Sequence, residues 1–211
     1  MSEPRLITAA LVIADISSYT EFITFNRRSL LHAAEIVSEL LESVIDRAEF
    51  PLVLNKLEGD ATLLYSDISL DPARGAQDVV RQVSRFFDVF DTKTSEIATK
   101  RQSCGCDACQ SVRKLQLKLI LHAGEIAVRN IRQFEELTGE DVILVHRLLK
   151  NSLPQHEYIL MTEAFHQLAG GTFHADGKAY EEIYRDLGTV NVRVFLPGQF
   201  PGTTAHRHSS H

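Results

Sequence analysis

Apolar and polar residues alternate in blocks that predict a strand and a long helix at the start of the chain. Residues 6–14 are almost entirely Leu, Ile, Val and Ala, which predicts a strand buried on both faces. Ser18 followed by Glu21 has the spacing of a capping box. Apolar residues then recur every three or four positions, so we expect one amphipathic helix that ends near Glu49.

A hairpin and a second helix come next. Two apolar runs flank a Glu-Gly-Asp tripeptide, which predicts a β-hairpin with Gly59 and Asp60 at its tip. Asp71 followed by Pro72 is typical of a helix start, and the apolar stripe behind it continues to about Ile97. A polar, cysteine-rich insertion follows at about 101–113.

The second half of the chain adds further strands and short helices. Leucines alternate with polar residues over 115–121, which predicts a half-buried strand, and Gly124 indicates a turn into another strand at 125–131. We expect a helix after Gly139, a strand at 158–161 and a short helix capped by Thr162. Late strands are expected at 178–184 and 190–196.

This order of elements predicts an α+β fold with one mainly antiparallel sheet covered by helices. We expect a single domain over residues 1–198 and a disordered tail over 199–211, because the tail has no periodicity.

Composition narrows the class of protein. The chain has 211 residues, 44% of them apolar, and a formal net charge of −6, which argues against nucleic acid as a general partner. Its apolar runs fall short of the roughly 18 residues that a membrane span needs. With no signal-peptide pattern and three clustered cysteines that do not form a disulfide framework, we expect a cytoplasmic protein with no membrane partner.

Two carboxylates are candidates for a metal site. Asp15 ends the first strand and Asp60 lies at the hairpin tip, and a βαββ unit can bring both to one end of the sheet. Converging carboxylates hold hard cations such as Mg²⁺, and a pair of such ions suits phosphoryl transfer. The alternative interpretation is that Asp15 caps a helix and Asp60 is only a turn residue.

The insertion holds a second candidate. Cys104, Cys106 and Cys109 form a C-x-C-x-x-C pattern that can bind Zn²⁺ if a fourth ligand joins them. His122, or a group on a partner chain, is the expected fourth ligand. The alternative is three free thiols in a loop.

Four stretches carry a resemblance to a known family. VIADISSYTEF resembles a strand signature in which an Asp-Ile pair precedes a Gly-Phe-Thr turn, and KLEGDATLLYS resembles a Gly-Asp hairpin. LILHAGEIAV is similar to a strand with a His-x-Gly turn, and LTGEDVILVHRLL to a helix that usually reads Gly-x-x-Val-Asn-x-Ala-x-Arg-Leu. In this order they resemble the catalytic domain of class III nucleotidyl cyclases, over about residues 6–196. The motif HRLLKN and the cysteine insertion point to an uncharacterised bacterial branch.

The resemblance implies a ferredoxin-like βαββαβ core and assigns roles to particular residues. Asp15 and Asp60 match the two aspartates that bind Mg²⁺ or Mn²⁺, and Ile16, which follows Asp15, is assigned to the same metal site. The turn after Ile16 matches the segment whose backbone amides face the terminal phosphates. Its residues are Ser17, Ser18, Tyr19 and Thr20, and Ser18 stands where the family prefers glycine.

Other matches concern the base and the transition state. Lys56 and Glu136 match residues that read adenine, which favours ATP, although both could be ordinary surface charges. Arg147 matches the catalytic arginine, while Ile143 replaces the family's asparagine one helical turn earlier. Arg193 lies near the place of a lysine that binds the triphosphate, and a surface cation is the alternative.

The resemblance therefore implies two functions. The first is a homodimeric adenylate cyclase, a phosphorus–oxygen lyase that makes cyclic AMP and pyrophosphate from ATP with two metal ions. The second is a catalytically degenerate cyclase-homology module that binds nucleotide or a partner and acts in signalling. Ile143 favours the second function, and the retained acids with Arg147 favour the first.

Overall fold

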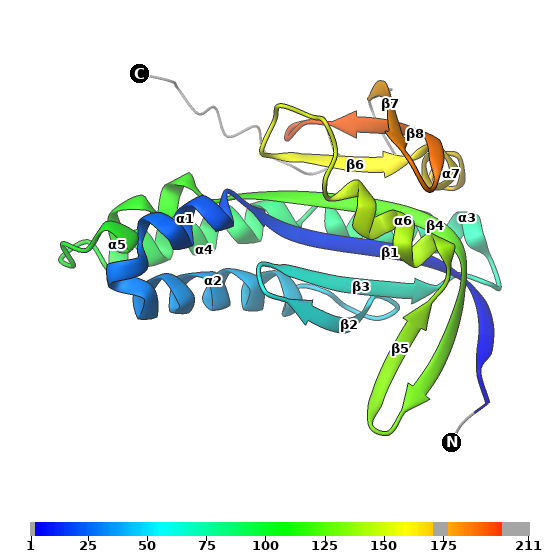
Figure 1. Ribbon diagram of the computed structural model, residues 1–211, viewed down its shortest axis with the longest axis horizontal. Coiled ribbons are helices and arrows are strands. Elements are labelled where there is room, and N and C mark those ends of the chain that lie inside the picture. The colour runs from blue at the N-terminus through cyan, green and yellow to red at the C-terminus, as the bar shows by residue number, and fades with distance from the viewer. Residues whose placement is uncertain (1–2, 171–176, 200–211) are drawn as a thin grey trace.

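A single mixed sheet organises the molecule. The computed structural model describes residues 3–170 and 177–199, and its strands lie in the order β2-β3-β1-β4-β6-β8-β7, with β5 paired to β4 (Figure 1). Among these strands only the β4–β6 pair is parallel, so the predicted α+β class with a mainly antiparallel sheet is confirmed. The strands are β1 Arg5–Ser17, β2 Val53–Glu58, β3 Ala61–Asp67, β4 Gln116–Ile131, β5 Phe134–Thr138, β6 Tyr158–Thr162, β7 Lys178–Tyr184 and β8 Gly188–Phe195.

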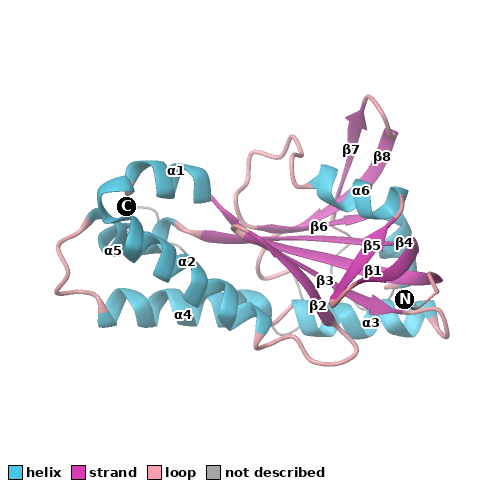
Figure 2. Cartoon of the chain, turned by 60° about the horizontal axis from the view of Figure 1, so that its bottom comes forward, coloured by secondary structure: helices cyan, strands magenta, loops and turns pink. Residues whose placement is uncertain are grey.

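Helices cover the two faces of this sheet unequally. One face packs against α2, α3, α4 and α7. Helix α6 lies on the other face, opposite α3 (Figure 2). The helices are α1 Tyr19–Phe25, α2 Leu30–Ile45, α3 Pro72–Val83, α4 Phe86–Lys100, α5 Asp107–Ser111, α6 Glu140–Leu148 and α7 Glu163–Leu168. Within the described ranges, no helix is long and apolar enough to cross a membrane.

Strand β1 lies at the centre and contributes to both cores. Val12, Ala14 and Ile16 pack toward the larger set of helices, and Leu11 and Ile13 pack on the α6 side. All five are fully buried, as the unbroken apolar run predicted. Because successive side chains of a strand point to opposite faces, the next odd-numbered residue of β1 also faces the α6 side.

The expected long helix is broken. Helix α1 ends at Phe25, and α2 begins only at Leu30 after a short 3-10 turn. Buried Asn26 causes the break, because its side-chain amide donates to the Phe22 carbonyl at 2.8 Å and to Ser111 Oγ at 3.4 Å. The capping box was also wrong: Ser18 makes no side-chain cap and has a left-handed backbone with φ of 66°.

The middle of the chain differs from expectation in two more places. The second helix is interrupted between Val83 and Phe86, which gives α3 and α4. No turn forms at Gly124, because β4 runs through it as one strand of sixteen residues. Glycine is required there for another reason, since the carboxylate of Asp141 on α6 fills the space that a Cβ would occupy. Strand β5 was not predicted at all.

Several expected features are confirmed: the hairpin tip, the helix starts at Pro72 and Glu140, and the late strands. In the tail predicted to be disordered, residues 200–211 lie outside the described residues.

Candidate functional site

The two predicted metal-binding acids come together at one end of the sheet. Asp15 lies two positions before the end of β1 and pairs with Ala61, the first residue of β3. Asp60 occupies the β2–β3 turn, and its carbonyl accepts the Ile16 N–H at 3.0 Å. The convergence expected from the order of strand and hairpin is therefore confirmed, and Asp15 faces the α6 side of the sheet as strand alternation requires.

Sequence reasoning missed the cation that accompanies these acids. Lys118 of β4 lies directly across from Asp15 in the ladder, and its Nζ is 2.9 Å from Asp15 Oδ2. Burial raises the pKa of Asp15 to about 6, even though the bond from Lys118 acts in the opposite direction. Burial also raises the pKa of Asp60, against a smaller effect of Lys118. The alternating polar residues of this strand predicted a solvent-exposed face, whereas Lys118 lies on the same face of the sheet as Asp15.

The turn after β1 has a left-handed residue at Ser18. Ser18 stands at the glycine position and adopts φ 66° and ψ 12°, a conformation that glycine reaches without strain. Ser17 Oγ donates to the His156 carbonyl at 2.5 Å, and the Phe22 N–H bonds the Ser18 carbonyl at 2.8 Å. This segment thus turns sharply into α1, which begins at Tyr19 and continues through Thr20, immediately beside the two acids.

The two predicted base-reading residues also meet. Lys56 Nζ of β2 lies 3.1 Å from Glu136 Oε2 of β5, and each side chain is 36% exposed. Two neighbouring bonds dock β5 onto the hairpin: Tyr65 donates to Glu135 Oε1 at 2.5 Å, and Asn55 donates to the Glu135 carbonyl at 3.1 Å. Residues eighty positions apart therefore form one polar cluster, although their role toward a nucleotide stays a prediction.

Helix α6 presents the third group of matched residues. Arg147 is about half exposed and bonds Asp186 Oδ2 at 2.8 Å. Ile143, one turn earlier, is 53% exposed, so the missing asparagine would have projected to solvent and not into the core. His146 Nδ1 lies 3.3 Å from Glu58 Oε2 beside the hairpin tip, which ties α6 to the end of β2.

The structure places two other candidates away from their expected roles. Arg193 bonds Glu163 at 2.8 Å, and its β8 neighbours Val192 and Val194 face the α6-side core. Strand alternation therefore turns Arg193 to the face opposite Asp15, which speaks against a triphosphate contact within the same chain.

His122 was wrongly expected to complete the cysteine site. It is buried, with Nδ1 2.8 Å from Thr162 Oγ1 and Nε2 2.7 Å from Asp141 Oδ1. Asp141 also accepts the Glu125 N–H at 2.8 Å, and the contact with His122 holds the pKa of Asp141 below its usual value. This network fastens α6 to β4, so both ring nitrogens of His122 have partners other than the cysteines.

Comparison with solved structures identifies the fold. The adenylyl cyclase CyaB from P. aeruginosa superposes with a TM-score of 0.68 at 14% identity, over 95% of this chain and all of that one. The guanylyl cyclase Cya2 gives 0.63 at 14% identity, over 98% and 96% of the two chains. A class III adenylyl cyclase-like ATP-binding protein from Pseudomonas aeruginosa gives 0.66 at 13% identity, over 80% of this chain and 36% of that one. The chain has the fold of class III nucleotidyl cyclase domains, as its motifs indicated.

Sequence comparison gives the family. The chain belongs to the family described as "Protein of unknown function (DUF2652)", whose model matches residues 37–158. A relative in Mycobacterium tuberculosis, named uncharacterized protein Rv2561/Rv2562, is 38% identical over 134 residues, which are 62% of this chain. This chain spans 59% of the length of that relative.

Proposed function

We propose that this chain binds ATP with divalent cations and converts it to cyclic AMP and pyrophosphate, at a site completed by a second copy of the chain. The observation that carries this proposal is the convergence of Asp15 and Asp60 beside the left-handed turn at Ser18. Cyclase domains of this fold act on nucleoside triphosphates, and two structural relatives support ATP in particular. One is titled an ATP-binding protein, and a rhodopsin-guanylyl cyclase of converted specificity was solved with ATPαS.

The donor set fits Mg²⁺ or Mn²⁺. Carboxylate and backbone carbonyl oxygens are the ligands that hard divalent cations prefer, and Asp15, Asp60 and the Ile16 carbonyl would hold them. When bound, such cations activate an oxygen nucleophile and neutralise charge on the phosphates. In the metal-free chain, Lys118 supplies the positive charge next to Asp15.

The chain's own residues would position the substrate. The backbone amides at the start of α1, from Ser18 to Thr20, suit the terminal phosphates because amides at a helix start carry partial positive charge. Lys56 donates and Glu136 accepts, which matches the ring nitrogen and amino group of adenine. Their mutual bond holds both side chains in place before a base arrives.

A second copy would complete the site. The acids lie near the end of β1 and in the β2–β3 turn, whereas the Lys56–Glu136 pair joins the edge strand β2 to β5. A two-fold interface can place the acids of one copy against the base-reading pair of the other. Exposed apolar side chains near these elements support such an interface: Ile143 (53%), Ile131 (47%) and Phe134 (61%).

Arg147 is the proposed charge-stabilising residue. Its guanidinium is half exposed and bonded only loosely into the fold through the exposed Asp186, so it is available to a phosphate. Ile143 offers no donor, and we therefore expect slow turnover. Because Ile143 projects to solvent, Ile143→Asn should restore a donor without damage to the core and raise the rate.

The test incubates the purified protein with each nucleoside triphosphate and Mn²⁺ and measures cyclic products by mass spectrometry. We expect cyclic AMP, loss of nearly all product in Asp15→Asn and Asp60→Asn, and about a hundredfold to a thousandfold loss in Arg147→Ala. Asp67→Asn is the matched control, since Asp67 is a half-exposed acid of β3 paired with Arg5 and should not matter.

One observation, Ile143 at the position of the asparagine of the cyclase motif, favours the noncatalytic module as a second candidate. If neither the parent nor Ile143→Asn makes a cyclic product, while ATP with Mn²⁺ binds and Asp60→Asn abolishes that binding, the cyclase proposal fails and the binding module stands. If ATP does not bind at all, both fail.

A further inference from the structure

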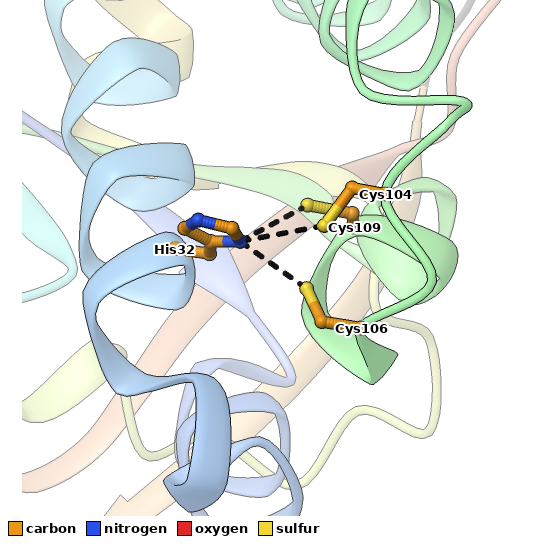
Figure 3. Close-up of side chains that lie close together, drawn as sticks. All are labelled: His32, Cys104, Cys106 and Cys109. Carbon is orange, nitrogen blue, oxygen red and sulfur yellow. Dashed lines mark hydrogen bonds between the residues drawn. The ribbon is translucent and has the colours of Figure 1, made fainter.

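Four side chains outside the proposed nucleotide site converge on one point. His32, in the first turn of α2, directs Nδ1 toward the sulfurs of three cysteines around α5 (Figure 3). The distances from His32 Nδ1 are 3.3 Å to Cys106 Sγ, 3.6 Å to Cys104 Sγ and 3.7 Å to Cys109 Sγ. All four ligating atoms lie within 4.8 Å of one another.

We propose that His32, Cys104, Cys106 and Cys109 bind one structural zinc ion. Three sulfurs and one imidazole nitrogen form a Cys₃His set, one of the tetrahedral combinations found in structural zinc sites. With Zn–S near 2.3 Å and Zn–N near 2.0–2.1 Å, tetrahedral angles place the nitrogen about 3.5 Å from each sulfur. The three distances here, 3.3 to 3.7 Å, bracket that separation.

The donor set also selects the kind of metal. Thiolates are soft ligands that favour zinc over magnesium or calcium, which take oxygen ligands. The three cysteines carry no disulfide, and Cys109 is buried while the others are partly buried. The four donors that close a structural site are therefore all present in one chain, and no partner chain is needed.

Residues around the four ligands fit a bound cation with thiolates. The Cys109 N–H donates to the Cys106 sulfur, and Arg101 donates to the sulfur of Cys109. Three thiolates with Zn²⁺ and a neutral imidazole carry one net negative charge, and the Arg101 guanidinium lies beside it. Arg101 is itself held by Glu35 at 3.0 Å and Glu39 at 2.8 Å. Such outer contacts orient the ligands of metal sites.

The position of the site indicates what the zinc does. It joins the start of α2 to the segment between α4 and β4, and a parallel contact runs from Asn26 to Ser111 of α5. The insertion is therefore fastened over the corner where α1 passes into α2. The zinc is structural in this proposal, because all four positions are filled by protein ligands.

The first experiment measures metal in the full-length protein purified without chelators. We expect about one zinc per chain by elemental analysis, and three thiols that react with a thiol reagent only after a strong chelator is added. Replacement by Co²⁺ should give the visible bands of a tetrahedral site and a thiolate-to-metal charge-transfer band. A chain that holds no zinc when one equivalent is added, or whose cysteines form a disulfide, overturns the proposal.

Variants test the ligand set itself. His32→Ala and Cys106→Ser should each lose most of the zinc, whereas His32→Cys should keep it, because a fourth thiolate is also a zinc ligand. His156→Ala, an exposed histidine outside the cluster, is the matched control and should keep its metal. A full-length chain with His206, His208 and His211 replaced by alanine tests for adventitious binding at the C-terminus.

If zinc content follows the C-terminal histidines and not His32, the site is wrong. The same conclusion follows if His32→Ala leaves the cobalt spectrum unchanged. Where Cys106→Ser does not fold, the cobalt spectrum and thiol protection of the parent protein still decide the question. None of these measurements depends on nucleotide, so the zinc proposal and the cyclase proposal can fail separately.

Discussion

The two candidate metal sites of this chain lie on opposite faces of one sheet and use opposite kinds of ligand. Of the carboxylate pair, Asp15 lies on the α6 face and Asp60 in the adjoining β2–β3 turn, and Lys118 compensates part of the buried charge of Asp15. The cluster of His32 with three cysteines packs against the other face, where Cys109 belongs to the core. Its four donors converge on each other, and the Arg101 guanidinium donates to the Cys109 sulfur beside them.

This difference shows how a site for a transient ligand differs from a site for a permanent one. At the acids, an ammonium group within bonding distance offsets part of the cost of burying the Asp15 carboxylate without a metal. Among the sulfurs, three cysteine side chains and one imidazole offer four ligand atoms within 4.8 Å of one another, which is the complete ligand number of a closed structural zinc site. A metal should therefore come and go at the acids and stay at the cysteines.

The largest effect should follow removal of the cluster metal. A strong chelator should lower Tm by about 10 °C, because a structural zinc contributes several kcal/mol and each kcal/mol shifts Tm by about 2–4 °C at this size. Scanning calorimetry before and after one equivalent of Zn²⁺ is restored checks this, with Mg²⁺ as the control ion. An unchanged Tm would contradict a structural role.

The next effect concerns Lys118. Lys118→Met should cost about 3–5 kcal/mol of unfolding free energy at pH 7 without metal, because it leaves the Asp15 carboxylate buried and unpaired. Added Mg²⁺ should recover part of the loss. Urea unfolding measures both, and Lys114→Met, an exposed lysine just before the same strand, should change stability by less than about 0.5 kcal/mol. Equal costs in the two variants would show that Lys118 does not compensate Asp15.

A pH dependence should follow from Asp15 in the metal-free protein. Its pKa is raised from 3.8 to about 6 in the folded chain, so between these values the folded state holds more protons than the unfolded state. Below pH 4 the contribution of Asp15 to the free energy of unfolding is therefore fully present. It is lost as pH rises through about 6, by at most about 3 kcal/mol. Asp15→Asn should remove this component from urea-unfolding curves measured between pH 4 and 7.

The smallest effect concerns the backbone at Ser18. Ser18→Gly should stabilise the chain by about 1 kcal/mol or less. A non-glycine residue in the left-handed region costs about 1–2 kcal/mol, but glycine loses more conformational entropy on folding, which cancels part of the gain. Thermal unfolding measures it. Ser17→Gly is the control and should destabilise, since Ser17 has ordinary strand geometry and its hydroxyl bonds the His156 carbonyl. A loss of stability in both variants would contradict strain at Ser18.

Sequence reasoning predicted the contacts that depend on neighbouring elements. Asp15 and Asp60 could be brought together because a strand followed by a hairpin leaves few ways to pair. The Lys56–Glu136 contact came only from the resemblance to a family, since no local pattern announced β5. The broken helix at Asn26 was missed because its cause is a bond to Ser111, which lies 85 positions away.

At both candidate metal sites, the sequence analysis missed one residue for the same reason. Lys118 reaches Asp15 through the long antiparallel register of β1 and β4, which no periodicity reveals. His122 was chosen for the cysteines because it is near them in sequence, yet the fold directs it to Asp141 and supplies His32 instead. In both cases the residue type was visible, and only the three-dimensional pairing was not.

The separation of His32 from its sulfur partners bears on how the chain folds. His32 and Cys104 are 72 positions apart, so a metal held between them closes a loop that contains the hairpin and both long helices after it. A link across a loop of this length removes entropy from the unfolded chain, in the way a disulfide does, at about 4 kcal/mol in the chain-entropy account. A thiolate–zinc link of this kind does not depend on oxidation. The refolding rate of this protein should therefore rise with free zinc concentration in a reducing buffer.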